Sequence, residues 1–154
     1  MATRINARLK DLYVDDFYVW TQRQAELLRA RRFDELDLDN LIEEVAELGE
    51  AVKKSVRSRV RTNIEHLLKL QHLPALDPPP GWRERIRTQR DDLSDDLAPA
   101  LRRVLEQEID GLYAQARSHA AGALRDHVED AVADALPAGC PYTLDQITGD
   151  WLPE

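Results

Sequence analysis

Four glutamates crowd one short stretch of the chain, and carboxylates at this density can bind a cation or pair with arginines. They are Glu43, Glu44, Glu47 and Glu50. At helical spacing three of them share a face, where mutual repulsion would favour a bound cation if that face were buried. The alternative, which we favour, is a solvated acidic face near a helix N-terminus. Because apolar residues flank the stretch, we still expect Glu43 or Glu44 to be partly buried against an arginine.

Histidine is the other residue type here that could act as a base or a metal ligand. Di-iron bundles use Glu-x-x-His pairs, but none of the four histidines has a carboxylate three residues before it, and none is paired with another four residues away. We therefore predict no metal, no cofactor and no catalytic residue. His66 lies next to Ile64 and Leu67, and we expect it to hydrogen-bond inside the protein or to lie beside a cleft.

Arginines at helical spacing give the chain two basic faces that could contact phosphates. Arg83, Arg87 and Arg90 form the first, and the second consists of Lys53, Lys54, Arg57, Arg59 and Arg61. No helix-turn-helix, zinc or RNA-recognition signature accompanies them, and the net charge is −8. Salt bridges to the neighbouring acidic residues are the favoured interpretation, so nucleic acid is an unlikely partner. Cys140 is the single cysteine, and no base or positive charge beside it would form a thiolate.

These residues must be positioned by helices, because apolar residues recur every three or four positions through most of the chain. We predict helices over about 15–31, 37–72, 82–97, 99–135 and 143–148. Asp15 is the expected cap of the first, Pro99 suits the first turn of the fourth, and Thr143 with Gln146 has the spacing of a capping box. The fold class is all-α: an irregular helical bundle with two long helices, two shorter ones and a short C-terminal helix. We expect a single domain over residues 1–154.

Several segments of the chain, in this order, match those of a known family. They are residues 16–20 (DFYVW), 31–44 (RRFDELDLDNLIEE), 66–69 (HLLK), Trp82 with Ile86, Gln89 and Arg90, and residues 140–143 (CPYT) with Gln146. On these motifs the chain resembles the bacterial domain of unknown function family number twenty-nine, from about Leu12 to the C-terminus. Leu70 stands where that family usually has tryptophan, and Trp151-Leu152-Pro153 where it often has Phe-Trp-Pro. The resemblance implies an all-helical fold and a bacterial source, and it implies no activity.

Three functions of different classes fit these observations. We favour a protein-interaction or regulatory module, since such a protein needs no catalytic residues. The first alternative is a nucleic-acid-associated protein that uses the two basic faces. The second is an enzyme with a site around Glu43, Glu44 or Glu47 and His66. The sequence contains no signal-peptide pattern and no membrane-spanning run, which predicts a cytoplasmic protein. A helix over 37–72 would span about 54 Å, longer than a compact monomer of this size, so a homodimer is one expected arrangement.

Overall fold

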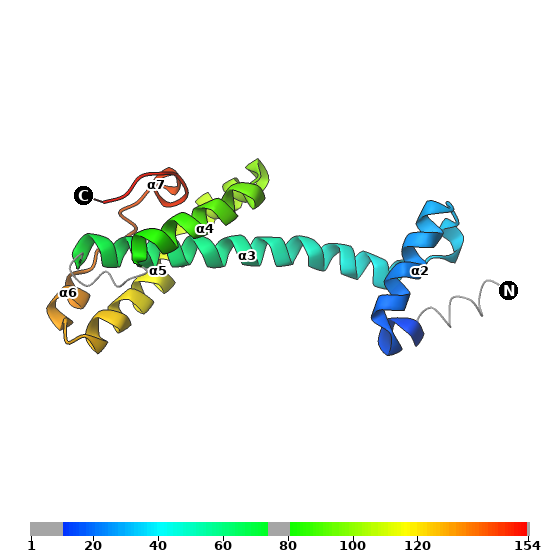
Figure 1. Cartoon of the computed structure of the whole chain (residues 1–154), viewed down its shortest axis with the longest axis horizontal. Helices are drawn as coiled ribbons and strands as arrows, with labels where there is room; N and C mark the ends of the chain where they lie inside the picture. Colours follow the sequence, from blue (N-terminus) through cyan, green and yellow to red (C-terminus); the bar gives the residue numbers. More distant parts are fainter. Residues whose placement is uncertain (1–10, 74–80, 154) are drawn as a thin grey trace. The chain divides into compact units, whose positions relative to one another are not determined.

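The computed structural model describes residues 11–73 and 81–153, and all regular elements in these ranges are helices (Figure 1). Residues 11–15 are helical. The elements that follow are α2 (Phe17–Arg29), the 3-10 turn η1 (Phe33–Glu35), α3 (Leu38–His72), α4 (Trp82–Asp96), α5 (Pro99–Asp126), α6 (Asp130–Ala135) and α7 (Leu144–Thr148). The all-α class predicted from the helical stripes is confirmed. The prolines that were expected to end the long helix, at 74 and 78–80, lie outside the described residues.

The contacts divide the chain into two compact units, Met1–Ala51 and Val52–Glu154. The sequence analysis predicted one domain over 1–154, and the boundary between the two units falls inside α3. Each unit is described by itself below. No helix in the described part of the chain is long and apolar enough to cross a membrane.

In the first unit, α2 begins one residue later than the sequence suggested. The side chain of Asp16, not that of Asp15, accepts the backbone amide of Val19 at 3.1 Å and so caps the helix. Val14 and Val19, on either side of this cap, have the spacing of a hydrophobic staple, but their side chains are 82% and 43% exposed. The cap shifted because residues 11–15 are themselves helical, and the amide of Asp16 still bonds to Leu12.

A small core and a buried polar cluster hold α2 against the start of α3. Leu27 and Leu36 are buried, with Leu12 and Leu41 packed beside them. Nε1 of Trp20 donates to Oδ2 of Asp37 at 3.1 Å, and Nδ2 of Asn40 donates to the same oxygen at 2.7 Å. The backbone amide of Asp37 donates in turn to Oε1 of Gln24 at 3.0 Å. Asp37 is 1% exposed, and these contacts replace the hydration of its Oδ2 and of its backbone amide.

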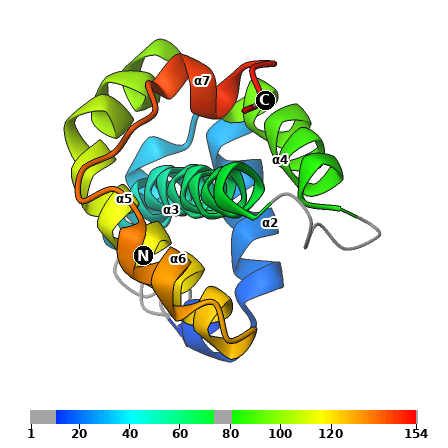
Figure 2. The same cartoon turned by 90° about the vertical axis from the view of Figure 1, so that its left-hand side faces the viewer.

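The second unit is built around the later part of α3. Figure 2 shows this part of the helix end-on, with α4 and α5 on opposite sides of it and α7 between their outer edges. Val56, Val60, Ile64, Leu67 and Leu68 are completely buried there. The step of four between most of these residues rotates their stripe around the helix, which lets one helix serve neighbours on both sides. Their partners in the same core include Ile86 and Leu93 of α4 and Leu105 and Leu112 of α5.

The helix predicted over 99–135 is wrong as a single element. It is two helices, α5 and α6, separated by residues 127–129. Val128 has a φ of 63°, and the amides of Val128 and Glu129 turn back to the carbonyls of Arg125 and Leu124. This is a Schellman-type helix end, and it lets α6 fold back so that Ala133 is buried in the core. Pro99 occupies the first turn of α5, as predicted.

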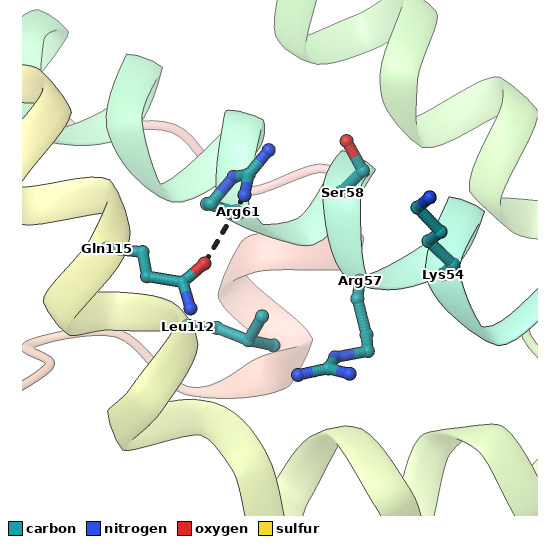
Figure 3. A pocket seen from close by; sticks show the side chains of 6 residues that line it. All are labelled: Lys54, Arg57, Ser58, Arg61, Leu112 and Gln115. Carbon is teal, nitrogen blue, oxygen red and sulfur yellow. Dashed lines mark hydrogen bonds between the residues drawn. The ribbon is translucent and has the colours of Figure 1, made fainter.

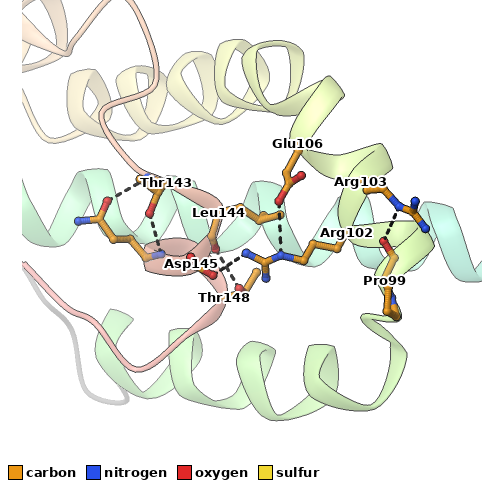
Figure 4. A network of polar contacts seen from close by, with 9 residues as sticks. Pro99, Arg102, Arg103, Glu106, Thr143, Leu144, Asp145 and Thr148 are labelled. Carbon is orange, nitrogen blue, oxygen red and sulfur yellow. Dashed lines mark hydrogen bonds and ion pairs between the residues drawn. The ribbon is translucent and has the colours of Figure 1, made fainter.

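The C-terminal segment is held by the cap of α7 and by two arginines, Arg102 of α5 and Arg90 of α4. Thr143 and Gln146 form the predicted capping box at the start of α7, and Tyr142 and Ile147 are buried. Arg102 of α5 reaches Asp145 and pairs with Glu106 on its own helix (Figure 4). Gly149 ends α7, and a Cβ at this position would lie 2.7 Å from the carbonyl oxygen of Asp145. The segment is therefore part of the second unit's fold.

Candidate functional site

The early part of α3 exposes the apolar stripe that the sequence analysis expected to be buried. The apolar stripe is defined here as Leu38, Ile42, Val45 and Leu48, which are 57%, 59%, 61% and 68% exposed. From Val45 to Glu50 every residue is exposed. At 100° per residue the four side chains occupy an arc of roughly 120° on the helix. The stripe stays exposed because α2 packs on the adjoining side of α3, which carries Asp37, Leu41 and Glu44.

The acidic residues lie away from this stripe. Glu43, Glu47 and Glu50 are exposed, so the solvated arrangement is what the structure shows for them. Glu44 is half-buried as predicted, but its partner is a tyrosine rather than an arginine: the hydroxyl of Tyr13 donates to Oε1 of Glu44 at 2.7 Å. This hydrogen bond, above all, raises the pKa of Tyr13 to about 12, because ionisation would place two negative charges together. The described carboxylates and histidines include no group of three that could hold a metal ion.

The aromatic residues beside α2 divide between core and surface. The rings of Tyr13 and Trp20 meet edge to face with centroids 5.0 Å apart, and Phe17 stacks on Trp20 at 5.6 Å. Trp20 is 1% exposed, whereas Tyr18 and Phe33 are mostly exposed. Trp20 therefore stabilises the first unit, and the exposed aromatic rings add to its uncovered apolar surface.

A basic pocket of about 200 Å³ lies between α3 and α5 in the second unit (Figure 3). Its lining residues are Lys54, Arg57, Ser58, Arg61, Leu112 and Gln115. Nε of Arg57 is 2.9 Å from Oε2 of Glu108, and Nη1 of Arg61 donates to Oε1 of Gln115 at 3.3 Å. The sequence indicated the three cations, since they follow one another at helical spacing. It could not indicate that Ser58, Leu112 and Gln115 line the same pocket. Leu112 and Gln115 belong to α5, and Gln115 is more than fifty residues from its partner Arg61 in the sequence.

The basic side predicted for α4 is split by the structure. Arg83 and Arg87 are exposed, but Arg90 is 7% exposed and points into the fold. Its guanidinium donates to the backbone carbonyls of Gln146, Ile147 and Trp151 at 2.6, 3.0 and 2.8 Å. Burial lowers the pKa of Arg90, yet the three carbonyls match its planar donors. Arg90 thus holds the C-terminal segment and does not belong to a phosphate-binding face.

His66 lies beside a cleft, which is one of the two positions expected for it. It is 6% exposed and lines a cavity of about 400 Å³ between α3 and α4, together with Thr62, Glu84, Arg85, Thr88 and Gln89. Glu43, Glu44 and Glu47 belong to the first unit and His66 to the second.

Cys140 has the surroundings of a packed thiol rather than of a nucleophile. Its Sγ lies 3.4 Å from the carbonyl oxygen of Tyr142, and it packs at the edge of the core. Burial raises the pKa of the thiol, so the neutral form predominates at neutral pH.

A family model described as "Domain of unknown function DUF29" matches residues 12–152, nearly the whole chain. The chain belongs to this family. No curated protein and no solved structure matched in the corresponding comparisons.

In the structure, several residues of the family-like motifs stabilise the fold. Trp20, Asp37 and Asn40 are the buried polar contacts that fasten α2 to α3. Arg90 and Gln146 come from two further motifs, and they meet where α4 holds the C-terminal segment. These motifs thus contribute buried contacts to the fold of both units.

Proposed function

We propose that this chain is a protein-interaction module that pairs through the apolar stripe of α3 with the same stripe in a second copy. The observation that carries the proposal is the exposure of four large apolar side chains, each more than half exposed, on one face of a helix. Contiguous apolar surface of this kind usually marks an interface. A helix whose residues 45–50 are all exposed buries apolar surface by pairing with another helix.

The spacing of the stripe suits a second helix of the same kind. Leu38, Val45 and Val52 recur every seven residues and Leu48 lies three residues after Val45, which is the a and d pattern of a heptad repeat. Leu41, at the other d position, is half-buried beside the core of the first unit. Val52, the next position in this register, is also exposed. In this register Val45 and Val52 occupy a positions and Leu41 and Leu48 occupy d positions. This combination favours a parallel coiled coil of two helices.

The charges nearby are compatible with self-pairing. In the same register Glu43 and Glu50 occupy f positions and Glu47 a c position, all on the outer side of a coiled coil. Glu44, at a g position, is engaged by Tyr13. Two copies can therefore approach through their apolar faces while their acidic faces remain in water.

The experiment is light scattering of the full chain after size-exclusion chromatography, with Leu48→Glu as the test variant and Ala46→Glu as the matched control. Ala46 is exposed on the same turn, outside the apolar stripe, so its replacement adds the same charge. We expect a dimer for the parent chain and the control, and a monomer for Leu48→Glu. A parent chain that stays monomeric at its highest soluble concentration contradicts the proposal, and so does a Leu48→Glu variant that stays dimeric.

A further inference from the structure

The basic pocket between α3 and α5 carries more positive charge than its surroundings neutralise. Lys53, Lys54, Arg57 and Arg61 project from α3 on this side, and Glu108 is the one carboxylate that pairs with any of them in the described part of the chain. Glu108 lies 2.9 Å from Arg57 and 3.9 Å from Lys53. The local balance is therefore strongly positive, although the whole chain carries a net charge of −8.

The contrast with Arg59, on the same helix, shows that this excess is confined to the pocket. Arg59 faces α4, where its guanidinium lies 2.9 Å from Asp96 and 3.9 Å from Asp92. Arg61 donates to the side-chain oxygen of the neutral Gln115 at 3.3 Å. Lys54 forms no ion pair with any residue in the ranges 11–73 and 81–153. Like charges held this close repel one another, so a bound anion would relieve a cost that the fold leaves uncompensated.

We propose that this pocket binds the phosphate group of a small phosphorylated metabolite. Two guanidinium groups and an ammonium group are among the side chains that line the pocket, and arginine donors match phosphate oxygens in pairs. The hydroxyl of Ser58 and the amide of Gln115 supply further donors, and the buried side chain of Leu112 forms an apolar floor.

The size of the pocket limits the ligand. A volume of about 200 Å³ is below the range of roughly 300–1,000 Å³ that drug-sized ligands occupy. It holds a phosphate group and a short organic part, and it is too small to enclose a whole nucleotide. The open side of the pocket leaves room for the rest of a longer ligand in solvent.

The test is a titration of the ¹⁵N-labelled full chain with sodium phosphate and with glycerol phosphate, followed by NMR at constant ionic strength. We expect saturable shifts confined to the amides and side chains around Ser58, Arg61 and Gln115. Lys54→Gln and Arg61→Gln should each weaken binding about tenfold or more, the loss expected for one charge-assisted hydrogen bond. Lys54 is fully on the surface, so its variant retains the fold even if that of Arg61 does not.

Arg83→Gln is the matched control, because it removes one exposed positive charge from α4, away from the pocket. It should leave the phosphate affinity within twofold of the parent value. Shifts that follow sodium chloride as closely as phosphate overturn the proposal, as does an affinity that Lys54→Gln and Arg61→Gln leave unchanged. Stronger binding of a DNA duplex through the same two residues also overturns it, since the ligand would then be a polymer backbone.

Discussion

Asp37 is a carboxylate that the fold removes almost completely from water. Its Oδ2 accepts hydrogen bonds from Trp20 and Asn40, and its backbone amide binds Gln24. Burying a carboxylate is unfavourable unless its partners are well placed, and here the donors come from α2 and from the first turn of α3. One side chain thus fixes how the two helices of the first unit meet.

Replacing Asp37 should therefore be costly. Asp37→Ala leaves the Trp20 indole and the Asn40 amide without their acceptor, and we expect a loss of about 3 kcal/mol in the stability of the first unit. Amide hydrogen exchange should show the loss in α2 and leave the amides of α5 unchanged. Glu50→Ala, which removes an exposed carboxylate farther along α3, is the control. Equal protection of α2 in Asp37→Ala and in the parent would show that the carboxylate is not what holds these helices together.

Residue partners were the part of the site that the sequence predicted least well. Arg90 was grouped with Arg83 and Arg87 because their spacing is helical, but its three acceptors are backbone carbonyls more than fifty residues away. Glu44 was correctly expected to be half-buried, yet the partner is Tyr13 from the residues before α2. Helical spacing fixes which residues share a face, whereas the partner across that face depends on tertiary contacts.

At the scale of elements, two helices are each followed by a non-glycine residue whose backbone is in the left-handed (positive φ) conformation. Arg31 after α2 and Val128 after α5 have φ values of 56° and 63°. In both places the following amides turn back to carbonyls of the last helical turn, which is the Schellman arrangement that usually has glycine. A β-branched side chain is especially unfavourable in this conformation, and Val128 is 84% exposed, so it gains little from packing.

Val128→Gly should therefore stabilise the second unit. Removing Cβ relieves about 1–2 kcal/mol of left-handed strain, and the larger backbone entropy of glycine in the unfolded chain offsets part of it. We expect a net gain of about 0.5–1 kcal/mol, measured by urea unfolding. Val128→Ala keeps the strained Cβ and should gain much less. A Gly variant that is less stable than the parent would contradict the φ value on which the argument rests.

The same helix end shows why some element boundaries could be predicted and others could not. Thr143 with Gln146 and Pro99 are local signals, and the structure confirms both. The break at residues 127–129 has no glycine or proline, so the sequence suggested an unbroken helix to 135. That break is favoured by tertiary packing, because it brings Ala133 and Leu136 into the core. A local pattern does not contain that information.

At the scale of the whole molecule, buried apolar surface is distributed very unevenly. Among the described residues, the core of the second unit has 21 buried members, whereas the corresponding cluster in the first unit has two, Leu27 and Leu36. The spacing of apolar residues correctly predicted that α3 has an apolar side. It could not show that the early part of this side stays exposed. A unit of about fifty residues with so small a core generally needs an additional source of stability. Pairing with a second copy would supply it.

This difference predicts that the two units respond differently to protein concentration. If pairing stabilises the first unit, mass action should slow the hydrogen exchange of α2 amides as concentration rises, by up to about tenfold for each tenfold increase. The amides of α5 belong to a unit with its own large core, and their exchange should not change. In Leu48→Glu the α2 amides should exchange quickly at every concentration, because the charge blocks pairing without touching the Asp37 contacts. If α2 in the parent chain exchanges at one fixed rate over the whole concentration range, its stability comes from within the chain, and the pairing of α3 stripes has no part in it.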